Sequence, residues 1–144
     1  MASIQTEAPV GGSKAAAISN YVVRTMSEYT GRGATRTRTH IHDDVVTVLL
    51  KDTLTKGERS LVSEELDELV LSMRKAFQGT MRGDLIGGVE EILGRTVVAF
   101  LSDNHIDPDA AVEVFLLARV DRPGRDGDGS GAAMAAEATA EAGL

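Results

Sequence analysis

The stretch that decides the fold is Thr35–Leu50, which reads TRTRTHIHDDVVTVLL. Its first part, Thr35–Ile41, alternates threonine with arginine or histidine, and a β-branched residue at every second position is typical of a strand. Asp43 and Asp44 follow as a turn. Val45–Leu50 is apolar at nearly every position, as expected for a strand that is covered on both faces. The stretch therefore predicts a tight β-hairpin.

A long helix is predicted after the hairpin. Thr55 and Glu58 have the spacing of a capping box, and an apolar stripe then continues in helical phase up to Gly94. Four glycines between residues 79 and 88 weaken this helix, so we expect a kink or a break there. The stripe consists of Val62, Leu66, Leu69, Met73, Phe77, Met81, Leu85, Val89 and Ile92.

The remaining elements complete an α+β fold. A shorter helix is expected to start at the N-cap Ser13 and to end at Gly31, and two more strands are expected at Thr96–Ser102 and Ala111–Val120. The resulting order is αββαββ. It predicts a two-layer sandwich with a four-stranded antiparallel sheet, one short helix and one long helix.

Composition narrows the class of protein. The 144 residues suffice for one hydrophobic core, predicted at residues 14–120 between disordered tails at 1–13 and 121–144. The net charge of -7 argues against a nucleic-acid partner, and the absence of cysteine excludes thiolate chemistry. No apolar stretch approaches the roughly 20 residues that span a bilayer, so we expect no membrane insertion. Residues 1–13 lack the pattern of a secretory signal, which predicts a cytoplasmic location.

The predicted strands carry more apolar surface than two helices can cover, and this excess predicts self-association. The strands at Val45–Leu50, Thr96–Leu101 and Val112–Ala118 are apolar on both sides, whereas two helices on one side cover only one sheet face. We therefore expect a homodimer whose interface includes the outer sheet face or the long helix between residues 64 and 92.

Basic and titratable side chains line one face of the first strand. Arg36, Arg38, His40 and His42 alternate along it and therefore share a face. Two arginines at this spacing suit a phosphate, a carboxylate or bicarbonate, although charges on a solvated edge strand also discourage edge-to-edge pairing. Together with Arg32 in the preceding glycine turn, these residues are the candidates for ligand or partner binding.

Two clusters of histidine and aspartate raise the question of a metal site. His40 and His42 precede Asp43 and Asp44, and His105 lies within the segment 103–109. Neither cluster has the spacing of a familiar metal motif, and aspartates in turns are common without any ligand. No motif of an activated nucleophile occurs either. We therefore expect no metal, no cofactor and no catalytic residue.

Several segments together carry a family resemblance. They are Tyr29–Ala34, Thr39–Val48, Leu54–Glu58 and Gly94–Val98. This pattern resembles the MpsC-like family of small bacterial proteins, long catalogued as a domain of unknown function. The family is named for the soluble component of a Na+-translocating, membrane-potential-generating system. The similarity extends over about residues 17–117.

The resemblance implies a non-enzymatic accessory protein of a cation (Na+) or inorganic-carbon transport system. Such a protein would act through protein–protein interaction with a membrane transporter subunit at the cytoplasmic face. The resemblance supplies no catalytic or ligand residue. Two alternatives stay open: a stand-alone small-anion binding or sensor domain that uses the basic strand face, and an enzyme that uses the histidine and aspartate clusters.

Overall fold

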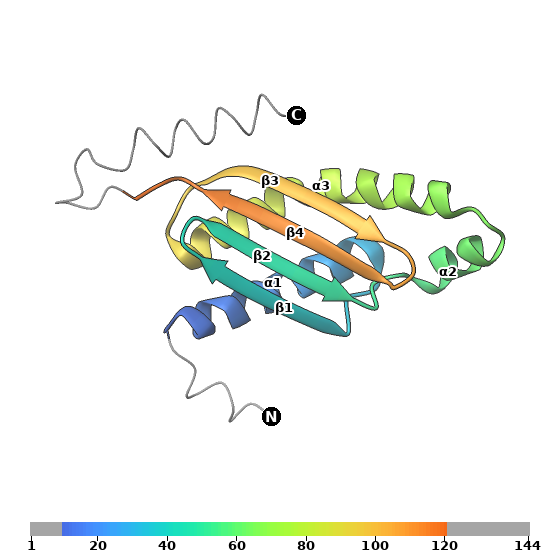
Figure 1. The fold of residues 1–144 in the computed structure, drawn as a ribbon, viewed down its shortest axis with the longest axis horizontal. Coiled ribbons are helices and arrows are strands. Elements are labelled where there is room, and N and C mark those ends of the chain that lie inside the picture. The colour runs from blue at the N-terminus through green and yellow to red at the C-terminus, as the bar shows by residue number, and fades with distance from the viewer. Residues whose placement is uncertain (1–9, 121–144) are drawn as a thin grey trace.

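The structure of the protein is a computed structural model that describes residues 10–120. Its elements are α1 (Val10–Thr30), β1 (Arg36–His42), β2 (Val45–Lys51), α2 (Lys56–Ser63), α3 (Asp67–Leu93), β3 (Val97–His105) and β4 (Ala110–Leu117). The strands form one antiparallel sheet in the order β1-β2-β4-β3. Helices α1 and α3 lie on one face of it (Figure 1). The predicted α+β sandwich is confirmed. The predicted tail 121–144, and residues 1–9 of the other tail, lie outside the described residues.

The predicted hairpin is present as β1 and β2. Every residue of β1 lies opposite a residue of β2, and the turn between them is Asp43–Asp44. Asp43 has a φ of 51°, the left-handed backbone conformation that tight hairpin turns require. Arg95, from the loop before β3, holds this turn. Its guanidinium group donates to the Asp43 carbonyl oxygen at 2.9 Å and to Asp44 Oδ1 at 2.8 Å.

The hydrophobic core lies between the sheet and the two long helices. Alternate residues of β2 and β4 point toward the helices, so the other set faces away from them. Within the described chain, no helix or strand covers this outer face (Figure 1). The buried core consists of Ile18, Val22, Met26, Val46, Val48, Leu50, Met81, Leu85, Val89, Ala111, Phe115 and Leu117.

The segment predicted as one long helix is divided into two. Residues 64–66 separate α2 from α3. Glu65 between them has a φ of 60°, a left-handed conformation that cannot continue a helix, and the Leu66 N–H donates to the Leu61 carbonyl at 3.0 Å. α3 runs without interruption through residues 79–88, where the break was expected.

One glycine of that zone has a different role. A Cβ atom on Gly88 would lie 2.1 Å from Cε2 of Tyr21, so the glycine lets the tyrosine ring of α1 lie directly against α3. The Tyr21 hydroxyl donates to the Asp84 carbonyl at 2.6 Å and holds the ring there. Gly88 therefore permits a close helix–helix contact and does not bend the helix.

The predicted apolar stripe is correct for the second half of α3 and wrong for the first half. Met81, Leu85 and Val89 are buried as expected. In the first half the buried positions belong to Val70, Arg74 and Gln78, because polar side chains of the sheet and loops face this part of the helix. The predicted core residues that are exposed instead are Leu66, Leu69 and Phe77.

α1 also differs slightly from its prediction. It begins at Val10, about one turn before Ser13. It ends at Thr30 before Gly31, whose φ of 82° stops a helix. Among residues 10–120, none of the helices has the length and apolar character needed to cross a membrane.

Two adjacent glycines provide a matched test of the α1–α3 contact. Gly88→Ala should destabilise the protein by about 1–3 kcal/mol, because the new methyl group clashes with the Tyr21 ring. Gly87→Ala should stabilise it by up to about 1 kcal/mol, because a Cβ there meets no atom within 4 Å and alanine favours the helix. Urea unfolding measures both changes. Equal effects of the two substitutions would contradict the contact.

Candidate functional site

Four of the five predicted site residues lie together on the outer face of β1. We call Arg36, Arg38, His40 and His42 the basic column; all four are exposed. His42 Nε2 lies 3.4 Å from Asp43 Oδ2. Within residues 10–120, neither arginine of the column has a hydrogen-bond or ion-pair partner. The two arginines therefore place uncompensated positive charge on this edge of the sheet.

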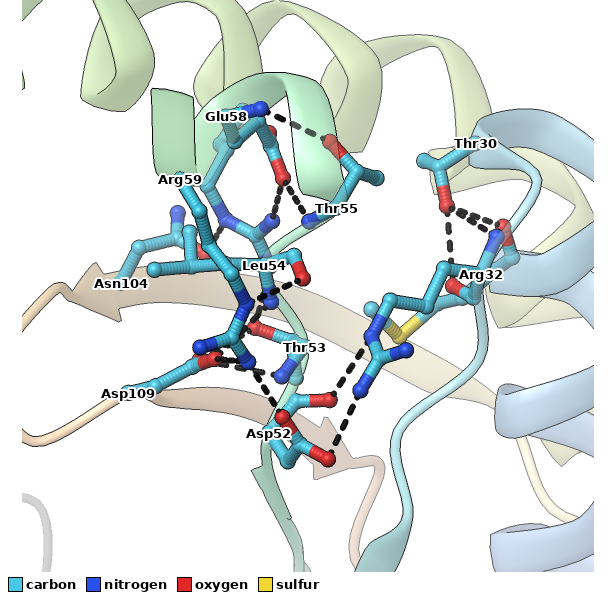
Figure 2. A network of polar contacts seen from close by, with 12 residues as sticks. Thr30, Arg32, Asp52, Thr53, Leu54, Thr55, Glu58, Arg59, Asn104 and Asp109 are labelled. Carbon is cyan, nitrogen blue, oxygen red and sulfur yellow. Dashed lines mark hydrogen bonds and ion pairs between the residues drawn. The ribbon is translucent and has the colours of Figure 1, made fainter. Parts of the chain in front are cut away.

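Arg32 lies apart from the basic column, in a loop network (Figure 2). Its Nη2 is 2.7 Å from Asp52 Oδ2, and its Nε donates to the Asp52 carbonyl oxygen at 3.3 Å. Arg59 of α2 pairs with the other carboxylate oxygen of Asp52. The hydroxyl of Thr35, which donates to this carboxylate, and the two guanidinium groups lower the pKa of Asp52. Arg32 thus holds the loop that follows β2.

Asp109 connects the same network to the turn between β3 and β4. Its Oδ1 accepts hydrogen bonds from the backbone N–H and the hydroxyl of Thr53, and its Oδ2 accepts one from the Leu54 N–H, at 2.9–3.0 Å. The ring of His105 is hydrogen-bonded to the Pro108 carbonyl at 2.9 Å. In the part of the chain that the structure describes, no three histidine or acidic side chains converge as metal ligands would. Asp109 therefore organises the loop that follows β2.

A buried ion pair between α2 and α3 lies behind this network. Arg74 Nη1 is 2.9 Å from Glu58 Oε1, and each side chain is 7% exposed. The other two Arg74 nitrogens donate to Thr53 Oγ1 at 2.7 Å and to Asn104 Oδ1 at 3.0 Å. Glu58 also accepts the Thr55 N–H at 2.8 Å, which completes the predicted capping box. The sequence indicated the cap, but it did not reveal Arg74, which shares a helix with the apolar stripe.

Glu113 is a fully buried carboxyl group on the inner face of β4. Gln78 Nε2 donates to its Oε1 at a long 3.4 Å. Among the described residues, Oε2 has no partner, and neither has the hydroxyl of Ser102, the residue opposite it on β3. Burial raises the pKa of Glu113 to about 7, although the charge of Arg74 and the hydrogen bond from Gln78 act in the opposite direction. A carboxyl group in the core therefore changes charge near neutral pH.

A groove of about 700 Å³ runs between α1 and the start of β1. Arg24 and Glu28 of α1 line it together with small polar residues of both elements. The basic column lies on the other side of β1 and does not line this groove. The groove and the column are therefore separate surfaces.

The junction of α2 and α3 presents a second charged surface. Residues 64–69, which we call the α2–α3 tip, read EELDEL, and all six are exposed. Leu66 and Leu69 are 43% and 47% exposed. Phe77, about two turns further along α3, is a third exposed apolar side chain and is 39% exposed. The tip lies beyond the end of the sheet (Figure 1), so it combines four carboxylates with exposed leucines on a projecting part of the molecule.

Glu113→Gln should change the pH dependence of stability. The folded state holds the Glu113 proton with a pKa of about 7, against an ordinary value of 4.5. Proton binding therefore stabilises the fold fully below about pH 4.5, and this contribution, up to about 3 kcal/mol, is lost as the pH rises through 7. We expect the glutamine variant to match the wild type near pH 5 and to be the more stable protein near pH 8.5 in urea unfolding.

Glu91→Gln, at an exposed position of α3, serves as the control, and we expect no such pH-dependent difference for it. A difference between wild type and Glu113→Gln that stays constant from about pH 5 to 8.5 would show that Glu113 does not titrate in this range.

The comparisons with known proteins agree with the family resemblance of the sequence. The family model described as "Na+-translocating membrane potential-generating system (MpsC)" matches residues 11–119. This match spans all seven helices and strands of the described chain except the first residue of α1. Curated proteins and solved structures give no match. The chain therefore belongs to the MpsC family.

Proposed function

We propose that this protein is a non-enzymatic accessory subunit of a cation (Na+) or inorganic-carbon transport system. It binds a membrane transporter subunit from the cytoplasmic side, and the α2–α3 tip is the surface that docks. The observation that carries this proposal is the tip itself, in which four carboxylates and two leucines are exposed together. Membership of the MpsC family supports the transport context.

The composition of the tip selects the chemistry of the partner. Asp67 and Glu68 stabilise the start of α3 through the helix dipole, but Glu64 and Glu65 precede α3 and have no such role. Exposed leucines between four carboxylates favour a partner that is apolar and basic. Cytoplasmic loops of membrane proteins carry an excess of lysine and arginine. Such a loop complements the tip, whereas the negative lipid surface itself repels it.

The test is capture of a transporter subunit from detergent-solubilised native membranes, with identification by mass spectrometry. The double substitution Glu64→Lys/Leu69→Ala should reduce the amount captured by about tenfold or more, because it reverses one charge and removes one apolar anchor of the tip. The fold should remain intact, because both positions are exposed. Capture by the wild type should also decrease with salt, because opposite charges attract across the interface.

A matched control is Leu71→Ala/Glu91→Lys. It removes one exposed leucine and reverses one exposed glutamate on the same helix, but Leu71 points about 200° away from Leu69 around α3. We expect this control to capture as much transporter subunit as the wild type. Equal losses for both variants, or no transporter subunit captured by the wild type, would contradict the proposed docking surface.

A further inference from the structure

The outer face of the sheet has a regular chemical order. Because the registers of the strand pairs are known, its residues can be read as rows that cross β1, β2, β4 and β3. Each row starts with a residue of the basic column. The rows of Arg38, His40 and His42 have uncharged, mostly apolar residues in the middle, whereas the row of Arg36 contains Lys51. Three successive rows are Arg38–Leu49–Val112–Asp103, His40–Thr47–Val114–Leu101 and His42–Val45–Leu116–Ala99.

The middle of this face is apolar and uncovered. Leu49 and Val45 of β2 are each 37% exposed, and on the edge strand β3, Val98 and Leu101 are 63% and 55% exposed. Among residues 10–120 both long helices lie on the opposite face (Figure 1). An apolar sheet face of this kind is buried in other proteins by a second sheet that stacks about 10 Å away.

Two ways exist to stack a second copy of this face by a two-fold axis that lies between the sheets. If the axis runs across the strands, β1 faces β1 of the other copy, and the two basic columns oppose each other. If the axis runs parallel to the strands, between β2 and β4, then β1 faces β3 and β2 faces β4 of the other copy. The first arrangement places like charges together, which is costly in an interface.

The second arrangement is complementary in charge and polarity at the row of Arg38. The row that contains Arg38 ends at Asp103, so Arg38 meets Asp103 of the partner subunit, and the symmetry repeats this pair on the other side. Between these two pairs, Leu49 meets the partner's Val112 in the same row. In the single chain, Arg38 has no ion-pair partner among the described residues, and Asp103 accepts only the N–H of the next residue, Asn104, at 2.8 Å.

We propose that the outer sheet face binds a second copy of this chain about a two-fold axis parallel to the strands, with reciprocal ion pairs between Arg38 and Asp103. The apolar rows supply the attraction, and the charged ends of the Arg38 row select the orientation and the register. The α2–α3 tip takes no part in this interface, so the dimer leaves two tips accessible to partners.

Charge reversal tests this arrangement by sedimentation equilibrium of the full chain. The wild type should be a dimer at about 10 µM. Arg38→Glu should raise the dimer dissociation constant by about tenfold or more, since two pairs of like charges replace two ion pairs. Asp103→Arg should do the same. The double substitution Arg38→Glu/Asp103→Arg restores both pairs with their signs exchanged and should return the constant to within about threefold of the wild type.

Lys75→Glu is the control, because it makes the same change of charge at an exposed position of α3, and it should leave the dissociation constant unchanged. Circular dichroism melts establish that every variant is folded. A monomeric wild type would overturn the proposal, as would a tighter dimer for Arg38→Glu, which the opposed basic columns of the other arrangement would give. A double variant as weak as the single variants would likewise overturn the proposed pairing.

Discussion

The ion pair between Glu58 and Arg74 is buried, so water cannot replace either partner if it is lost. Both charges are almost fully buried, and each costs several kcal/mol to desolvate unless it is paired and hydrogen-bonded. The partners come from three places: the capping position at Thr55, the loop at Thr53, and Asn104 on β3. Satisfying this pair therefore joins α2, α3, the loop after β2 and the sheet. It also determines where α2 lies against α3, and so it determines that the junction between them projects from the domain.

Charge is segregated in this small acidic protein. The net charge of -7 does not reveal that the outer sheet face carries the basic column, whereas the α2–α3 tip in the helical layer carries four carboxylates. In the loop network at the end of the sheet, by contrast, the charged residues pair with one another, as Arg32, Asp52 and Arg59 do. The polar network therefore accounts for the architecture, while the two outer surfaces are left for recognition. Association with a copy at one surface and with a transporter subunit at the other would let the dimer present two identical docking points.

Local sequence patterns are sufficient to predict the hairpin, the α2 capping box and the α+β class, because each of these features depends on residues that are close together in the sequence. The break at residues 64–66 was not predictable, since the apolar residues on both sides keep a common helical phase across it. Apolar periodicity also assigned Leu66 and Leu69 to the core, because it cannot detect that Arg74 has a buried partner 16 residues away in the sequence. The basic column was predicted from alternation alone. Glu113 was not, because its burial depends on the contact between β4 and α3.

The position of β4 in the sheet affects the order in which the chain can fold. Among residues 10–120, this strand is the last in sequence but lies between β2 and β3, and it makes every pairing that links the hairpin to the rest of the sheet. During synthesis, the β1–β2 hairpin and the helices leave the ribosome before that link exists. The apolar inner face of β2 then remains without its central neighbour until residues 110–117 are available. Contacts between residues so far apart in sequence slow folding. The apolar core residues of the nascent chain therefore stay exposed for a comparatively long time, and chaperones can bind them.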